Sequence, residues 1–279
     1  MIWIVTDSAQ ELKNDKDNGL VVVKLPVLIN GQAPKEDISD EQFYMLLDAE
    51  GVNLTTSQFS PAGFGELFDT LLQNPEDEVV AILLSSGLSG TFNSARLAAM
   101  EHEGRVHLVD SRNACLSQTA LVKEALRLRD QGLTASELAQ AVEKARDEVK
   151  LFAIVPTLKY LKKGGRISAA KAAIGELAGI KPIVTIDDKG EVGVAAQVRG
   201  LKKAVRQVAA LADKEGVDLE RPIVLGFSGL DRETITNLTT ELENVLKVSL
   251  ANEEPCSLSQ VLGVHVGPGA AGIGFFTKK

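Results

Sequence analysis

The sequence contains few cysteine, histidine and aromatic residues. Its 279 residues include two cysteines and three histidines, and aromatic residues make up 4%. Cys115 and Cys256 lie in opposite halves of the chain, in neither a disulfide framework nor a zinc pattern. We therefore predict no metal and no cofactor, and we interpret both thiols as buried apolar groups of a protein in a reduced, cytoplasmic setting.

Positive charge and long apolar runs are also scarce. Lys and Arg number 30 against 38 Asp and Glu, a net charge of −8, which argues against nucleic acid or an anionic membrane surface as a general partner. No run approaches the roughly 18 apolar residues that a membrane helix needs, and the start, MIWIVTDS, lacks the basic residues of a signal peptide. We expect a cytoplasmic protein with no transmembrane segment. Any contact with a membrane is expected to be transient.

Short apolar runs in the first half predict strands that alternate with helices. Residues 2–5, 79–84 and 106–109 each end in a small polar cluster: TDS, SSGLSGT and DS. If these strands are parallel, the clusters lie along the sheet edge where α/β proteins bind ligands. The pattern predicts an N-terminal α/β domain, residues 1–150, with a mainly parallel sheet flanked by helices.

The alternation changes after residue 150. Residues 180–186 and 192–198 flank DDKGE, which is a hairpin signal and predicts antiparallel pairing. Further strands are expected at 151–155, 223–227, 261–266 and 273–276, and helices at 201–212 and 233–247. The second half therefore predicts a C-terminal α/β domain, residues 151–279, with a mixed sheet.

The loop at residues 85–91, SSGLSGT, has the composition of an anion site. Glycines allow the backbone to curl, and amides at a helix N-terminus attract a carboxylate or phosphate. The loop has no lysine, so it is not a Walker A loop. An ordinary capped turn between strand and helix explains the same residues equally well.

Two other features of the sequence, the GLSGT segment and two arginines, each allow two interpretations. The segment GLSGT resembles the G-x-S-x-G elbow but has Thr91 in place of the last glycine, so a hydrolase or acyltransferase using Ser86 or Ser89 with His265 is the alternative hypothesis. Arg166 and Arg199 lie in glycine-containing basic stretches, where they either contact a phosphate or acidic partner or form a solvated surface.

Seven segments, taken together, resemble the DegV family of bacterial fatty-acid-binding proteins. In chain order they are Thr6-Asp7-Ser8, Thr56-Ser57-Gln58, residues 85–91, Asp110-Ser111, residues 163–168 (KGGRIS), Val198-Arg199-Gly200 and residues 265–269 (HVGPG). The resemblance implies two α/β domains that hold one long-chain fatty acid between them, with its acyl chain in an apolar tunnel.

The resemblance also implies roles for particular residues. Better-characterised members of the family are the lipid-presenting subunits of a fatty-acid kinase, whose separate ATP-binding subunit phosphorylates the bound carboxylate and feeds phospholipid synthesis. Arg166 and Arg199 match motifs that engage this kinase. No residue is assigned a catalytic role, and the carboxylate-binding positions implied here are Thr56, Ser57, Ser86, Ser89, Gly90 and His265.

The sequence departs from the family pattern in three places. Phe59 replaces a frequent proline, Gln197 replaces a lysine before the VRG motif, and residues 112–115 (RNAC) replace a glycine-rich helix start. Gln197 removes one positive charge beside the expected kinase surface. A lipid-binding scaffold that docks no kinase is therefore a third hypothesis.

Overall fold

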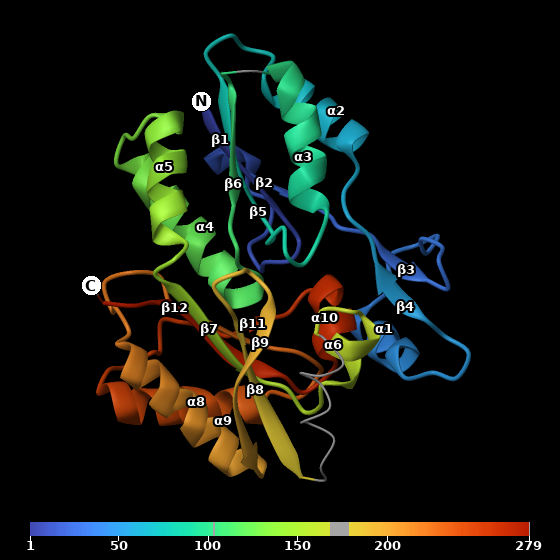
Figure 1. Cartoon of the computed structure of the whole chain (residues 1–279), viewed down its shortest axis with the longest axis vertical. Coiled ribbons are helices and arrows are strands. Elements are labelled where there is room, and N and C mark those ends of the chain that lie inside the picture. The colour runs from blue at the N-terminus through green and yellow to red at the C-terminus, as the bar shows by residue number, and fades with distance from the viewer. Residues whose placement is uncertain (103, 168–178, 279) are drawn as a thin grey trace.

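Four parallel strands form the sheet of the N-terminal half (Figure 1). The computed structural model describes residues 1–102, 104–167 and 179–278. The sheet has the order β2-β1-β5-β6, and its neighbouring strands are all parallel. The polar clusters that follow β1, β5 and β6 therefore lie at one edge, as predicted. The strands are β1 (Ile2–Asp7), β2 (Leu20–Val23), β5 (Glu78–Leu83) and β6 (Val106–Asp110).

Helices cover both faces of this sheet. On β5, Val80 and Ile82 pack on the side of α4 and α5, whereas Val79 and Ala81 pack on the side of α2 and α3. Because successive side chains of a strand point to opposite faces, a central strand covered on both faces is apolar throughout. The helices are α2 (Pro61–Leu71), α3 (Thr91–Ala99), α4 (Cys115–Asp130) and α5 (Ala135–Ala145), with the short η1 (Lys16–Asn18) and η2 (Met100–His102) nearby in the chain.

A six-stranded mixed sheet forms the C-terminal half, in the order β11-β10-β12-β7-β8-β9. β8 and β9 pair antiparallel, which confirms the predicted hairpin, and α8 (Leu201–Glu215) and α9 (Glu233–Leu246) cover one face. The predicted α/β class, with a parallel and a mixed sheet, is therefore confirmed. The strands are β7 (Val149–Ile154), β8 (Ile180–Ile186), β9 (Val192–Arg199), β10 (Val224–Phe227), β11 (Cys256–Ser257) and β12 (Ala271–Phe276).

The helix α4 lies between the two sheets (Figure 1). Its first turn rests directly on β12, where a Cβ added to Gly274 would lie 2.4 Å from the backbone carbonyl of Leu116. One hydrophobic cluster consequently contains Ile4 and Leu121 from the first half together with Leu151 and Phe276 from the second. The predicted division at residue 150 falls inside β7, and this shared core crosses it.

A third, smaller group of elements lies beside the mixed sheet. The two-stranded antiparallel sheet of β3 (Val27–Ile29) and β4 (Leu54–Thr56) and helix α1 (Asp40–Leu47) pack against α6 (Lys159–Lys163) and α10 (Gln260–Val266). Segments from the first sixty residues thus lie against elements of the C-terminal half, as Figure 1 shows.

The strand expected at residues 261–266 is wrong, because these residues form α10. A short apolar run does not distinguish a buried strand from a buried helix. Here Ser259 caps the helix by accepting a hydrogen bond from Leu262 N, and Gly267, with a φ of 71°, ends it. Val261, Leu262, Gly263 and Val264 are all buried, which explains the missing polar face.

Candidate functional site

A narrow cavity lies between α4, α10 and the face of the mixed sheet opposite α8 and α9. The volume of the cavity is about 100 Å³. Among the described residues, its wall is aliphatic over most of its length and includes no Phe, Tyr or Trp side chain. The polar side chains in the wall are Thr56, Ser57, Ser89, Arg166, Thr185 and His265.

Thr56 and His265 form the central pair of the polar end. Thr56 is the last residue of β4, and its Oγ1 lies 2.8 Å from Nε2 of His265 in the last turn of α10. These two residues are 209 positions apart, and they meet because the two-stranded β3–β4 sheet packs on α10. The sequence predicted both residues for one carboxylate site, and the structure brings them into contact.

The segment after β1 holds the start of α10 in place. The backbone N–H of Ser259 donates to both carboxyl oxygens of Glu11, at 3.1 and 3.0 Å, and the Ser259 hydroxyl donates to the Ser8 carbonyl at 2.8 Å. Burial raises the pKa of Glu11 to about 8, against the opposing effect of the Ser259 hydrogen bond. Glu11 therefore positions the helix that carries His265.

His265 is a neutral imidazole at neutral pH. Burial first, and the nearby Arg166 charge second, lower its pKa to about 4. Its Nδ1 is buried with no hydrogen-bond partner among the described residues, and a Cβ added to Gly164 would lie 2.3 Å from that atom. The tautomer with the proton on Nε2 donates to Thr56 Oγ1, which leaves the threonine O–H available to donate into the cavity.

Arg166 provides the positive charge of the cavity. Its Nε donates to the Leu88 carbonyl at 3.2 Å, and its Nη1 donates to the Gly164 carbonyl. These backbone acceptors orient a guanidinium that also lines the cavity. The sequence grouped Arg166 with Arg199, but Arg199 is exposed at the end of β9 and does not line the cavity.

The loop at residues 85–91 presents a hydroxyl to the cavity. The amides of Gly87, Leu88 and Ser89 donate to Ser85, and Ser85 Oγ donates to the Gly190 carbonyl at 2.8 Å. These amides are therefore occupied within the loop. Ser89 lines the cavity, and its Oγ lies 2.9 Å from Thr91 Oγ1.

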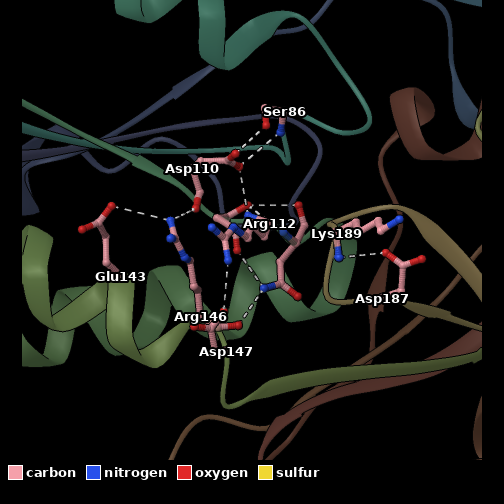
Figure 2. A network of polar contacts seen from close by, with 10 residues as sticks. Ser86, Asp110, Arg112, Glu143, Arg146, Asp147, Asp187 and Lys189 are labelled. Atoms are coloured by element: carbon pink, nitrogen blue, oxygen red, sulfur yellow. Dashed lines mark hydrogen bonds and ion pairs between the residues drawn. The ribbon is translucent and has the colours of Figure 1, made fainter.

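Ser86 does not line the cavity, and it belongs to a separate polar network (Figure 2). Its Oγ and its amide donate to the Asp110 carboxylate at 2.5 and 3.1 Å. The same carboxylate accepts from Arg112 N, and the Asp110 carbonyl accepts from Arg146. Ser86 thus joins the loop to β6 rather than to the cavity.

Gly90 and Ser57 take different positions around the polar end. Gly90 is outside the cavity wall, and a Cβ there would lie 1.8 Å from Oε1 of Gln58, whose amide nitrogen donates to Ser94 Oγ. Its lack of a side chain lets the TSQ segment lie against α3. Ser57 lines the cavity, with its amide bonded to the Pro26 carbonyl.

Sequence reasoning missed Glu11 and Gly164, and it placed Arg166 only at a partner surface. Nothing local to Glu11 signals its contact with Ser259, 248 positions away. In the described part of the chain there is no cluster of three or more side chains suited to a metal ion. No described helix is long and apolar enough to cross a membrane.

The two sheets and the mostly aliphatic cavity with one polar end define a class of α/β proteins built around an amphipathic site. A family model described as "Uncharacterised protein, DegV family" matches residues 1–278. The chain belongs to the DegV family, which confirms the resemblance found in the sequence. A DegV domain-containing protein of Caldanaerobacter subterraneus subsp. tengcongensis is 36% identical, with 100% of this chain and 99% of that protein covered.

Solved structures share the whole fold. A fatty-acid-binding DegV family protein from Thermus thermophilus is 31% identical with a TM-score of 0.87, over 99% of both chains. The fatty acid kinase (Fak) B3 protein of Streptococcus pneumoniae, loaded with linoleic acid, has a TM-score of 0.85 over 99% of both chains. At 20% identity, this second likeness concerns the fold alone.

Proposed function

We propose that the protein binds a long-chain fatty acid, with the carboxylate at the polar end of the cavity and the acyl chain along its aliphatic wall. The observation that carries this proposal is the distribution of polarity, because five of the six polar residues in the described wall come from segments that contact one another. Thr56, beside Ser57, contacts His265, and Arg166, near His265, donates to the carbonyl of Leu88, beside Ser89. A fatty acid has the same division. The fatty-acid binding of the Thermus thermophilus relative supports the proposal.

The proposed carboxylate site consists of donors and one cation. Arg166 offers a charge-assisted hydrogen bond, and the hydroxyls of Thr56, Ser57 and Ser89 offer neutral ones. His265 acts through Thr56, since its Nε2 is already bonded there. We leave Ser86 and Gly90 out of the ligand contacts, because neither lines the cavity.

We further propose that a separate ATP-binding kinase subunit phosphorylates the bound carboxylate, in the cytoplasm, for phospholipid synthesis. The shared fold with the Streptococcus pneumoniae kinase B3 protein supports this role. Phosphoryl transfer then belongs to the partner, which contacts the exposed Arg199. The alternative, a hydrolase, needs Ser86 or Ser89 beside His265, but Ser86 donates to Asp110 and Nε2 of His265 lies against Thr56. A histidine with a pKa of about 4 is also a weak base at neutral pH.

Organic extraction of the purified protein followed by mass spectrometry tests the binding. We expect a long-chain fatty acid in the extract, or saturable binding on titration of delipidated protein. An empty extract together with no binding on titration contradicts the proposal. Labelling by a serine- and threonine-reactive fluorophosphonate would instead favour the hydrolase.

The kinase role has its own test. With a cognate kinase, ATP and fatty acid, we expect acyl phosphate to form, and Arg199→Ala to reduce its formation without weakening lipid binding. Arg96→Ala, an exposed arginine on α3, is the matched control. Equal rates for both variants would refute Arg199 as a kinase contact, and lipid binding without acyl phosphate would favour the scaffold hypothesis.

A further inference from the structure

Cys115 has an unusual backbone conformation for a buried side chain. Four described residues other than glycine have a positive φ, and Cys115, at 58°, is the one that is buried. The left-handed region costs a residue with a Cβ about 1–2 kcal/mol relative to the right-handed one. Glycine would adopt this conformation without that cost.

The surrounding segment fixes this conformation. Cys115 N donates to the Ala9 carbonyl at 2.7 Å, and the Cys115 carbonyl accepts from Thr119 Oγ1 at 2.9 Å. Thr119 Oγ1 in turn accepts from Glu11 N. The first turn of α4 is therefore anchored to the chain that follows β1, and the direction of the Cys115 side chain is set by backbone contacts on both sides.

That direction places Cys115 in the cavity wall, toward the end away from the carboxylate site. From its N-cap Ser259 to His265, helix α10 rises about 9 Å at 1.5 Å per residue. Glu11, which contacts Ser259, lies near enough to Cys115 to raise the pKa of its thiol. Cys115 therefore lies toward the start of α10, and His265 lies at its end.

Residues along strand β7 also place Cys115 at the end of the cavity that is distant from the carboxylate site. Val155, just after the strand, belongs to the hydrophobic cluster of Leu161 and Ala270 near the polar end, whereas Leu151 belongs to the cluster that contains Cys115 and Leu116. Leu151 and Val155, which both line the cavity, are about 13 Å apart along the extended chain at 3.3 Å per residue. The cavity consequently extends from the polar end to a floor formed by Cys115, Leu116, Leu151, Gly226 and Leu258.

At this end of the cavity, the Cys115 thiol affects a bound molecule through its size and not through its reactivity. Burial, with a smaller effect of Glu11, raises the pKa of the Cys115 thiol well above its usual range. A thiol that stays protonated is a poor nucleophile and packs like a small apolar group. Its size and its direction are therefore the properties that act on a bound molecule.

We propose that the Cys115 side chain, projected into the cavity floor by its left-handed backbone, limits the length of acyl chain that the protein accepts. This inference rests on the proposed fatty-acid binding. The side chain has two heavy atoms, so Cys115→Gly opens room for about two methylene groups, each worth about fourfold in affinity when buried. The same substitution relieves the positive φ.

Competition among saturated fatty acids of 14 to 20 carbons, read by native mass spectrometry on the full-length protein, tests the inference. We expect Cys115→Gly to shift the preference toward longer chains, by about fourfold to fifteenfold for the longest chain over the one preferred by the wild type. Cys256→Ala is the matched control, since Cys256 lies outside the cavity wall with its Sγ bonded to the Leu225 carbonyl. It should leave the preference unchanged.

The outcomes separate the two proposals. If the wild type binds no fatty acid, the proposed function fails. If it binds, and Cys115→Gly keeps the wild-type preference, then the role of Cys115 alone is refuted. Should the glycine variant not fold, Cys115→Ala removes only the sulfur and must still shift the preference in the same direction, by about fourfold. An equal shift in Cys256→Ala would also refute the role.

Discussion

Replacing Thr56 by valine is the sharpest test of the carboxylate site, because it keeps the shape of the side chain and removes its hydroxyl. Thr56 Oγ1 lies 2.8 Å from Nε2 of the neutral His265, and in the tautomer with the proton on Nε2 the threonine O–H is free to donate to the ligand. A hydrogen bond to a charged group is worth about 1.5–3 kcal/mol. We therefore expect the dissociation constant for a long-chain fatty acid to rise about 10- to 150-fold.

The neighbouring Thr55→Val is the matched control. Side chains alternate along β4, and Thr55 does not line the cavity. Isothermal titration of delipidated protein with one fatty acid at pH 7.5 gives the affinities, and thermal unfolding shows whether each variant remains folded. Wild-type affinity in a folded Thr56→Val protein, or an equal loss in Thr55→Val, would refute the placement of the carboxylate beside Thr56.

Two further predictions concern the supports of His265. The raised pKa of Glu11, about 8 against 4.5 for the free side chain, means that its ionisation opposes folding, so stability falls as pH rises from 4.5 to 8, by at most about 5 kcal/mol. Urea unfolding at pH 5 and pH 8.5 should show Glu11→Gln gaining on the wild type as pH rises, and parallel pH profiles would contradict this. Gly164→Ala places a Cβ 2.3 Å from His265 Nδ1 and should weaken fatty-acid binding severalfold, whereas Gly65→Ala on α2, with open space around it, should not. Equal affinities for these two variants, measured by titration, would show that His265 does not depend on this contact.

The fold was largely predictable because its signals are local. The apolar run of β5 and the turn between β8 and β9 are contained in a few consecutive residues. Helix α10 was not predictable in the same way, since its run of four buried residues has neither helical nor strand periodicity. What makes it a helix is the cap at Ser259, reinforced by Glu11.

The candidate site also has features that the sequence predicted and others that it could not predict. Family motifs identified Thr56 and His265, and the structure brings them together across 209 positions. The motifs could not separate Ser86 from Ser89, because the two differ only in direction. Asp110 engages the Ser86 hydroxyl, whereas Ser89 reaches the cavity wall. A side chain's direction within a loop depends on partners that are distant in sequence.

The polar end of the cavity combines hydrogen-bond donors with one positive charge, which suits the anion proposed for it. Arg166 is the one cationic side chain in the described cavity wall, and its charge contributes to the low pKa of His265. A second positive charge on the imidazole would repel the first in a site with little water. A carboxylate bound beside Arg166, as proposed, would reverse this balance, since a nearby negative charge favours the protonated imidazole. Under the proposed binding we therefore expect the pKa of His265 to rise, so that both the guanidinium and the imidazole balance the negative charge of the ligand.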